Sequence, residues 1–102
     1  MSNSIKNYIS ENNDRFLEEL YSLIRIPSVS SHAHRQPEIR QCAEKWCELL
    51  LQSGVDSAIT METTGNPVVF ASKHLGDDLP TVLVYGHYDV MPAEPLELWH
   101  SA

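Results

Sequence analysis

Apolar residues recur at helical spacing through the first quarter of the chain. They occupy Ile5, Tyr8, Ile9, Phe16, Leu17, Leu20, Tyr21 and Ile24. These three- and four-residue intervals are typical of an amphipathic helix. Asn12 and Asn13 interrupt the pattern, so we expect two short helices, the second beginning near Asn13 or Asp14. Pro27 should end the second helix, because a proline pushes the residue before it out of the helical region.

A third helix is predicted after the polar, serine-rich stretch SVSSHAHRQ, which we interpret as a loop. Pro37 suits the first turn of a helix, where a missing backbone N–H costs nothing. Gly54 is the expected end of this helix. Between Pro37 and Gly54, apolar residues at helical spacing form one face of the helix. This apolar face consists of Ile39, Cys42, Ala43, Trp46, Leu49 and Leu50.

Three strand-like runs follow, at residues 56–62, 67–73 and 81–85. The turn residues Gly65 and Asn66 separate the first two runs, which are close enough in sequence to form a hairpin. The third run has no polar alternation, which predicts a strand covered on both faces. Helices followed by strands indicate an α/β architecture with helices packed on a sheet. Such a sheet needs more neighbours than this chain supplies, so we expect self-association through the third strand's edge.

Composition and charge narrow the function classes. With 42% hydrophobic and 21% charged residues, the chain is typical of a soluble globular protein. Its net charge of −7 argues against a nucleic-acid partner. No apolar run approaches the roughly 20 residues of a membrane span, and the first residues do not resemble a secretory signal. Cys42 and Cys47 are interpreted as small buried hydrophobes rather than a disulfide or a metal site. These features favour a cytoplasmic protein.

The segment TVLVYGHYDVMP contains the clearest candidate for chemistry. Residues two apart on an extended backbone point to the same side, so His87 and Asp89 should emerge together at the end of the third strand. A histidine that binds a metal through one ring nitrogen needs an acceptor at the other, and a nearby carboxylate provides it. Gly86 would allow the backbone to come close to a metal ion or to turn sharply, and Pro92 would restrict the chain that follows the motif.

A His-x-Asp triplet alone is common, and an ordinary polar loop is the alternative interpretation. Its context is more specific. The twelve residues TVLVYGHYDVMP resemble the first metal-ligand motif of the M20 metallopeptidase family. RFLEELYSLIRIPSVS and IRQCAEKWCELLLQSG resemble that family's opening helix and loop and its next helix, and GHYDVMPAEPLELW is most similar to its dipeptidase branch. The remaining histidines, His32, His34, His74 and His100, are interpreted as surface or loop residues.

The resemblance implies a zinc site. His87 would be a ligand of one of two zinc ions, with cobalt or manganese as alternatives to zinc. Asp89 would act in catalysis by orienting His87. The family's bridging Asp, Glu-Glu pair, further acidic ligand and distant His have no matching motif in this sequence. Residues 1–102 are therefore expected to be an incomplete N-terminal portion of a three-layer, zinc-peptidase-like catalytic domain, with helices packed on a mixed sheet and no lid or dimerisation domain.

The resemblance also implies an activity, namely hydrolysis of the amide bond of a dipeptide or small N-acyl amino acid. It implies a homodimer for the full-length protein. Two alternatives stay open: a deacylase of an amino-acid biosynthetic intermediate, and a non-catalytic truncated remnant. In that family the residues that select the substrate lie mostly beyond the part matched here, so the sequence does not identify the substrate. Residues 1–102 alone are expected to be inactive.

Overall fold

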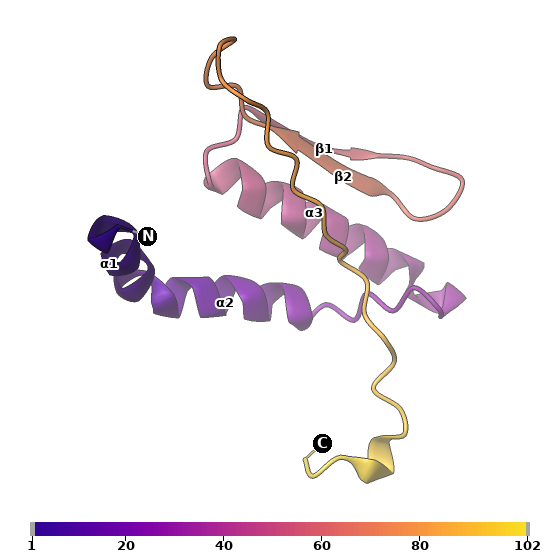
Figure 1. Cartoon of the computed structure of the whole chain (residues 1–102). Helices are drawn as coiled ribbons and strands as arrows, with labels where there is room; N and C mark the ends of the chain where they lie inside the picture. The colour runs from indigo at the N-terminus through magenta and orange to yellow at the C-terminus, as the bar shows by residue number, and fades with distance from the viewer. Residues whose placement is uncertain (1, 102) are drawn as a thin grey trace.

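Helices make up the first half of the chain, and a β hairpin followed by a long extended segment makes up the second (Figure 1). The computed structural model describes residues 2–101. The elements in chain order are α1 (Asn3–Glu11), α2 (Asn13–Ile24), a 3-10 turn η1 (Ala33–Arg35), α3 (Gln36–Gln52), β1 (Ser57–Met61), β2 (Val68–Ser72) and a second 3-10 turn η2 (Leu96–Leu98). None of the described helices is both long and apolar enough to span a bilayer.

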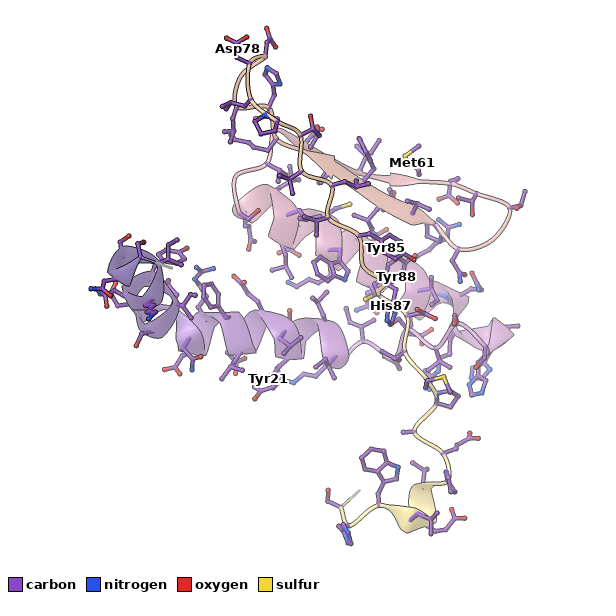
Figure 2. The ribbon with its side chains drawn as sticks, viewed as in Figure 1. Tyr21, Met61, Asp78, Tyr85, His87 and Tyr88 are labelled. Carbon is purple, nitrogen blue, oxygen red and sulfur yellow. The ribbon has the colours of Figure 1, made fainter. Side chains whose placement is uncertain are left out.

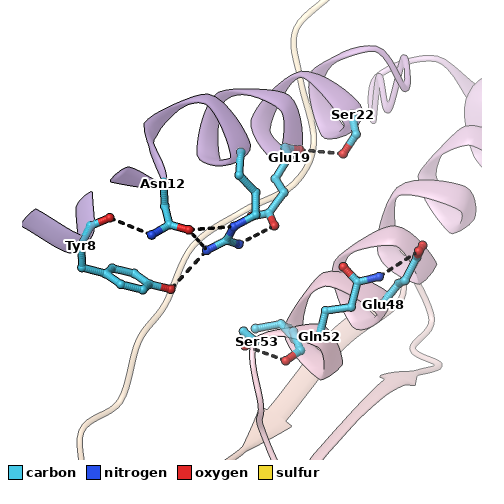
Figure 3. A network of polar contacts seen from close by, with 9 residues as sticks. Tyr8, Asn12, Glu19, Ser22, Glu48, Gln52 and Ser53 are labelled. Atoms are coloured by element: carbon cyan, nitrogen blue, oxygen red, sulfur yellow. Dashed lines mark hydrogen bonds and ion pairs between the residues drawn. The ribbon is translucent and has the colours of Figure 1, made fainter. Parts of the chain in front are cut away.

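The predicted break between the first two helices is confirmed and lies at Asn12. The Asn12 side chain donates to the Tyr8 carbonyl at 2.9 Å, which satisfies the end of α1. The guanidinium of Arg15 then joins the two helices by donating to the Tyr8 hydroxyl at 3.1 Å and to Glu19 at 2.8 Å (Figure 3). These contacts link α1 to α2, and neither helix has a buried residue.

The third helix is the central packing element. Its N-terminal turn contains the predicted proline, and Gly54 follows its C-cap with a φ of 100°, a conformation that favours glycine. Ile39, Cys42 and Ala43 are buried. Together with Ile26 and Val29 of the preceding loop they form the small hydrophobic core.

The hairpin predicted at residues 56–62 and 67–73 is also confirmed. β1 and β2 pair antiparallel, with Ala58 opposite Ala71 and Ile59 opposite Phe70. Opposed residues share a face of the sheet, and α3 packs on this hairpin. Ala58 and Ala71 are half-buried, whereas the side chains of the other face are about half exposed.

The third predicted strand is wrong. Residues 81–85 adopt no strand in the structure, and Val82, Leu83, Val84 and Tyr85 are 82–91% exposed rather than covered on both faces. An extended run becomes a strand only when a neighbour pairs with its N–H and C=O groups, and no strand among residues 2–101 pairs with this one.

The predicted mixed sheet and three layers are likewise not found within residues 2–101. The sheet described there is two-stranded and antiparallel, with α3 beside it. The parallel component is one isolated bridge, between Val29 and Val90. The structure therefore confirms an α/β arrangement and does not confirm a zinc-peptidase fold.

Candidate metal-ligand segment

His87 and Asp89 contact each other on the extended segment that follows the hairpin. The Nδ1 atom of His87 lies 2.9 Å from Oδ1 of Asp89 and 3.1 Å from the Asp89 backbone carbonyl oxygen. A carboxylate oxygen and a carbonyl oxygen can only accept, so Nδ1 must carry the proton. The neutral imidazole consequently has its lone pair on Nε2, the nitrogen that would face a metal ion.

The other oxygen of Asp89 is held by a distant loop. The hydroxyl of Ser30 donates to Oδ2 of Asp89 at 2.6 Å. The Ser30 hydroxyl, and after it the His87 imidazole, hold the pKa of Asp89 below its usual value. Asp89 is therefore ionised at neutral pH, as a group that accepts from two donors should be.

The backbone on either side of Asp89 is docked on the loop between α2 and η1. The Val90 N–H donates to the Ser28 carbonyl at 3.0 Å, and Val29 and Val90 form the parallel bridge. The hydroxyl of Ser28, which is 1% exposed, donates to the Tyr88 carbonyl at 2.7 Å. Residues 88–90 are thus held by residues 28–30, about sixty positions earlier in the chain.

Tyr88 anchors the same segment to α3 and the hairpin. Its hydroxyl donates to the carbonyl of the buried Pro67. Burial raises the pKa of Tyr88, which keeps the phenol protonated and able to donate. Burial likewise raises the pKa of the Cys42 thiol, whose sulfur lies 3.7 Å from the Tyr88 carbonyl oxygen. Figure 2 shows Tyr88 and His87 where the extended segment crosses α3.

The His87 ring itself faces outward from this anchored backbone. Its side chain is 78% exposed, and no hydrogen bond among the described residues engages Nε2. An imidazole with one nitrogen fixed by a carboxylate and the other open fits one ligand position of a zinc site. Residues 2–101 contain no group of three or more His, Cys, Asp or Glu side chains that could hold a metal ion. The described residues fit a single ligand position and not a complete site.

The other histidines do not join His87. His32 and His34 stack on each other, with ring centroids 5.2 Å apart, and His74 pairs with Asp77 at 3.0 Å. Cys42 and Cys47 are both free thiols, so no disulfide forms between them.

A groove of about 300 Å³ lies between α2 and α3, away from His87. It is lined mostly by apolar side chains, and its members include none of the predicted site residues: Phe16, Glu19, Leu20, Leu23, Trp46, Leu49, Leu50 and Ser53. This groove separates two helices and offers no cluster of reactive groups.

Ser28 and Ser30 belong to the candidate site, although the sequence pattern predicted only a loop at these positions. The available signal was the spacing of two serines, two residues apart, in the Ile-Pro-Ser-Val-Ser stretch, which is itself part of the resemblance. Only the fold shows that both hydroxyls turn toward residues 88–89.

Curated proteins similar to the chain include dipeptidases. A Cys-Gly metallodipeptidase of Candida albicans is 36% identical over 105 aligned positions, which cover 91% of this chain and 22% of the relative. A Cys-Gly metallodipeptidase of Saccharomyces cerevisiae is 33% identical over 99 positions, covering 85% of this chain and 21% of the relative. The chain is a distant homologue of the Cys-Gly metallodipeptidases.

A bacterial relative of the chain agrees with this homology. A cysteinylglycine-S-conjugate dipeptidase of Corynebacterium striatum is 32% identical over 95 positions, covering 89% of this chain and 20% of that protein. The chain thus spans about a fifth of the length of these curated relatives. No family model and no solved structure matches it. The resemblance to the M20 metallopeptidases is confirmed as distant homology.

Proposed function

We propose that this chain contributes the ligand His87 to the metal site of an M20-type hydrolase that cleaves the amide bond of dipeptides. The observation that carries the proposal is the contact between His87 Nδ1 and the Asp89 carboxylate, which leaves Nε2 open to solvent. The relatives are named as metallodipeptidases and a dipeptidase, which supports both the metal and the substrate class.

The chain's own residues hold and orient one ligand. Asp89 fixes the Nδ1–H tautomer of His87 and raises the basicity of Nε2. Residues 28–30 and Tyr88 fix the backbone from which both side chains project. A bound zinc ion, or cobalt or manganese in its place, would activate water and polarise the substrate carbonyl. The other ligands and the general base would come from residues other than those of this site.

The substrate class is proposed to be small dipeptides of the Cys-Gly kind. This rests on the names of the relatives, which refer to Cys-Gly and to cysteinylglycine conjugates. A deacylase acting on an N-acyl amino acid shares the same bond chemistry and differs in the group on the acyl side. A homodimeric full-length protein and a cytoplasmic location remain predictions.

The test is a hydrolysis assay on the protein expressed from its complete reading frame. We expect zinc-dependent release of glycine from Cys-Gly, its loss in His87→Ala, and its retention in His74→Ala, which removes a histidine that pairs with Asp77 elsewhere. Faster cleavage of N-acetyl amino acids than of Cys-Gly would identify the deacylase instead. A reading frame that ends at Ala102, with no zinc-dependent turnover, would contradict the proposal and favour the non-catalytic remnant.

Residues 1–102 expressed on their own are expected to be inactive. A catalytic zinc site takes about three protein ligands, and residues 2–101 bring no three candidate side chains together. The measurement is the same Cys-Gly assay with added zinc. Turnover by residues 1–102 that His87→Ala abolishes would show that these residues form a complete zinc site.

A further inference from the structure

We propose that Ser30 is a positioning residue that sets the tautomer of His87 through Asp89. The hydroxyl of Ser30, the carboxylate of Asp89 and the imidazole of His87 form a continuous chain of hydrogen bonds, with lengths of 2.6 Å and 2.9 Å. The two ends of this chain attach to different oxygens of the same carboxylate, Oδ2 and Oδ1.

The need for a second donor follows from the flexibility of an aspartate. The torsion that turns a carboxylate about its own axis is broad and has no single preferred value. Asp89 is also 44% exposed, so packing alone does not fix its plane. A donor on Oδ2 removes that freedom and keeps Oδ1 directed at the Nδ1–H of His87. Without that donor, the carboxylate can turn and water can replace its contact with His87.

Ser30 can act in this way because its backbone is fixed relative to Asp89. The parallel bridge between Val29 and Val90 lies beside the Ser30–Asp89 pair. On one side of it, the buried Ser28 accepts from the Val90 N–H and donates to the Tyr88 carbonyl. The hydroxyl of Ser30 therefore projects from a loop segment that is hydrogen-bonded to residues 88–90.

The consequence is a ligand nitrogen whose state is set before any metal arrives. The ring nitrogen that carries the proton is determined by the hydrogen bond made at that nitrogen. Holding the Asp89 carboxylate in place favours the proton on Nδ1 and the lone pair on Nε2. That this lone pair serves a metal ion rests on the proposed function, whereas the tautomer itself does not.

The experiment measures the His87 tautomer in the full chain, kept metal-free with a chelator, by long-range proton–nitrogen correlation spectra of the imidazole. Ser30→Ala and Ser30→Val remove the hydroxyl, Ser30→Thr keeps it, and Ser31→Ala is a control at the exposed neighbouring serine. We expect the ratio of Nδ1–H to Nε2–H forms to fall by up to about fivefold in Ser30→Ala and Ser30→Val, the effect of losing the typical hydrogen bond between His87 Nδ1 and the Asp89 carboxylate once that carboxylate can turn away. The Asp89 carbonyl oxygen, 3.1 Å from Nδ1, accepts in every variant and limits the change. Ser30→Thr and Ser31→Ala should match the parent.

The Val and Thr variants have the same shape, so a difference between them reports the hydroxyl and not a change of packing. An unchanged tautomer ratio in Ser30→Val, with backbone amide spectra like those of Ser30→Thr, would overturn the proposal. Zinc binding to the complete reading frame is measured separately. A tautomer shift without zinc binding leaves the role of Ser30 intact and removes the proposed function. Zinc binding through His87 with no tautomer shift in the Ser30 variants would support the proposed function and overturn the role of Ser30.

Discussion

The carboxylate of Asp89 joins two parts of the chain that are 59 residues apart. One oxygen accepts from Ser30 and the other accepts from His87. The second contact could be predicted from the sequence, because residues two apart on an extended backbone share a side. The first contact could not, because it depends on how the loop after α2 folds back on residues 88–90. Sequence spacing predicts contacts between residues close in the chain, such as His87 and Asp89, but does not predict contacts between distant residues, such as Ser30 and Asp89.

Replacing Asp89 by asparagine tests its role at the residue scale. The Asp89→Asn substitution keeps the shape of the side chain but loses the charge that makes Nε2 of His87 a better ligand. We expect metal affinity, or activity, of the protein expressed from its complete reading frame to fall by roughly 10- to 100-fold. Circular dichroism should show an unchanged fold. Asp78→Asn, at an exposed turn, is the control (Figure 2). Equal zinc affinity in both variants would reduce Asp89 to a loop residue.

At the scale of elements, the sequence correctly predicts the helices and the hairpin, whose ends are determined by residues close to them in the chain. Asn12 divides the first two helices, and Gly54 follows the end of α3 with a positive φ. The turn around Gly65 sets the hairpin of β1 and β2. Residues 81–85 have the composition of a buried strand, but a strand also requires a partner. The composition of residues 81–85 is compatible with a strand, but no strand within residues 2–101 pairs with them, so they form none.

The burial of one face of α3 predicts which substitutions in this helix destabilise the protein. Ile39 is 0% exposed and lies in the small core, whereas Leu51 on the same helix is 51% exposed. Ile39→Ala should lower the free energy of unfolding by about 2–5 kcal/mol, because it removes buried methyl groups and leaves a cavity. Leu51→Ala should change it by less than about 0.5 kcal/mol. Urea denaturation followed by circular dichroism measures both. Equal unfolding midpoints would show that α3 does not pack on this core.

At the scale of the whole molecule, one contiguous apolar run lies exposed to solvent. Four consecutive side chains, from Val82 to Tyr85, are 82–91% exposed on an extended backbone. An unpaired, extended and apolar run offers free N–H and C=O groups to another chain. The apolar pattern of this run indicates burial, but its side chains lie at the surface because no strand among residues 2–101 pairs with it.

We therefore expect the 102-residue chain to self-associate through residues 82–85. Val84→Lys places a charge in this run and should shift the chain toward the monomer, since lysine on an edge opposes pairing. Thr64→Lys adds the same charge in the exposed hairpin turn and should not. Sedimentation analysis at several protein concentrations measures the mass. A monomeric parent, or equal association of both variants, would contradict the prediction.

The most direct test of the account is the zinc content of the protein expressed from its complete reading frame, measured by mass spectrometry of the metal after dialysis. His87 is held with Nδ1 on Asp89 and Nε2 open, so His87→Ala should lose at least part of the bound zinc. His74→Ala, which removes a histidine paired with Asp77, should retain all of it. Equal zinc content in the parent and in His87→Ala would show that His87 is not a metal ligand.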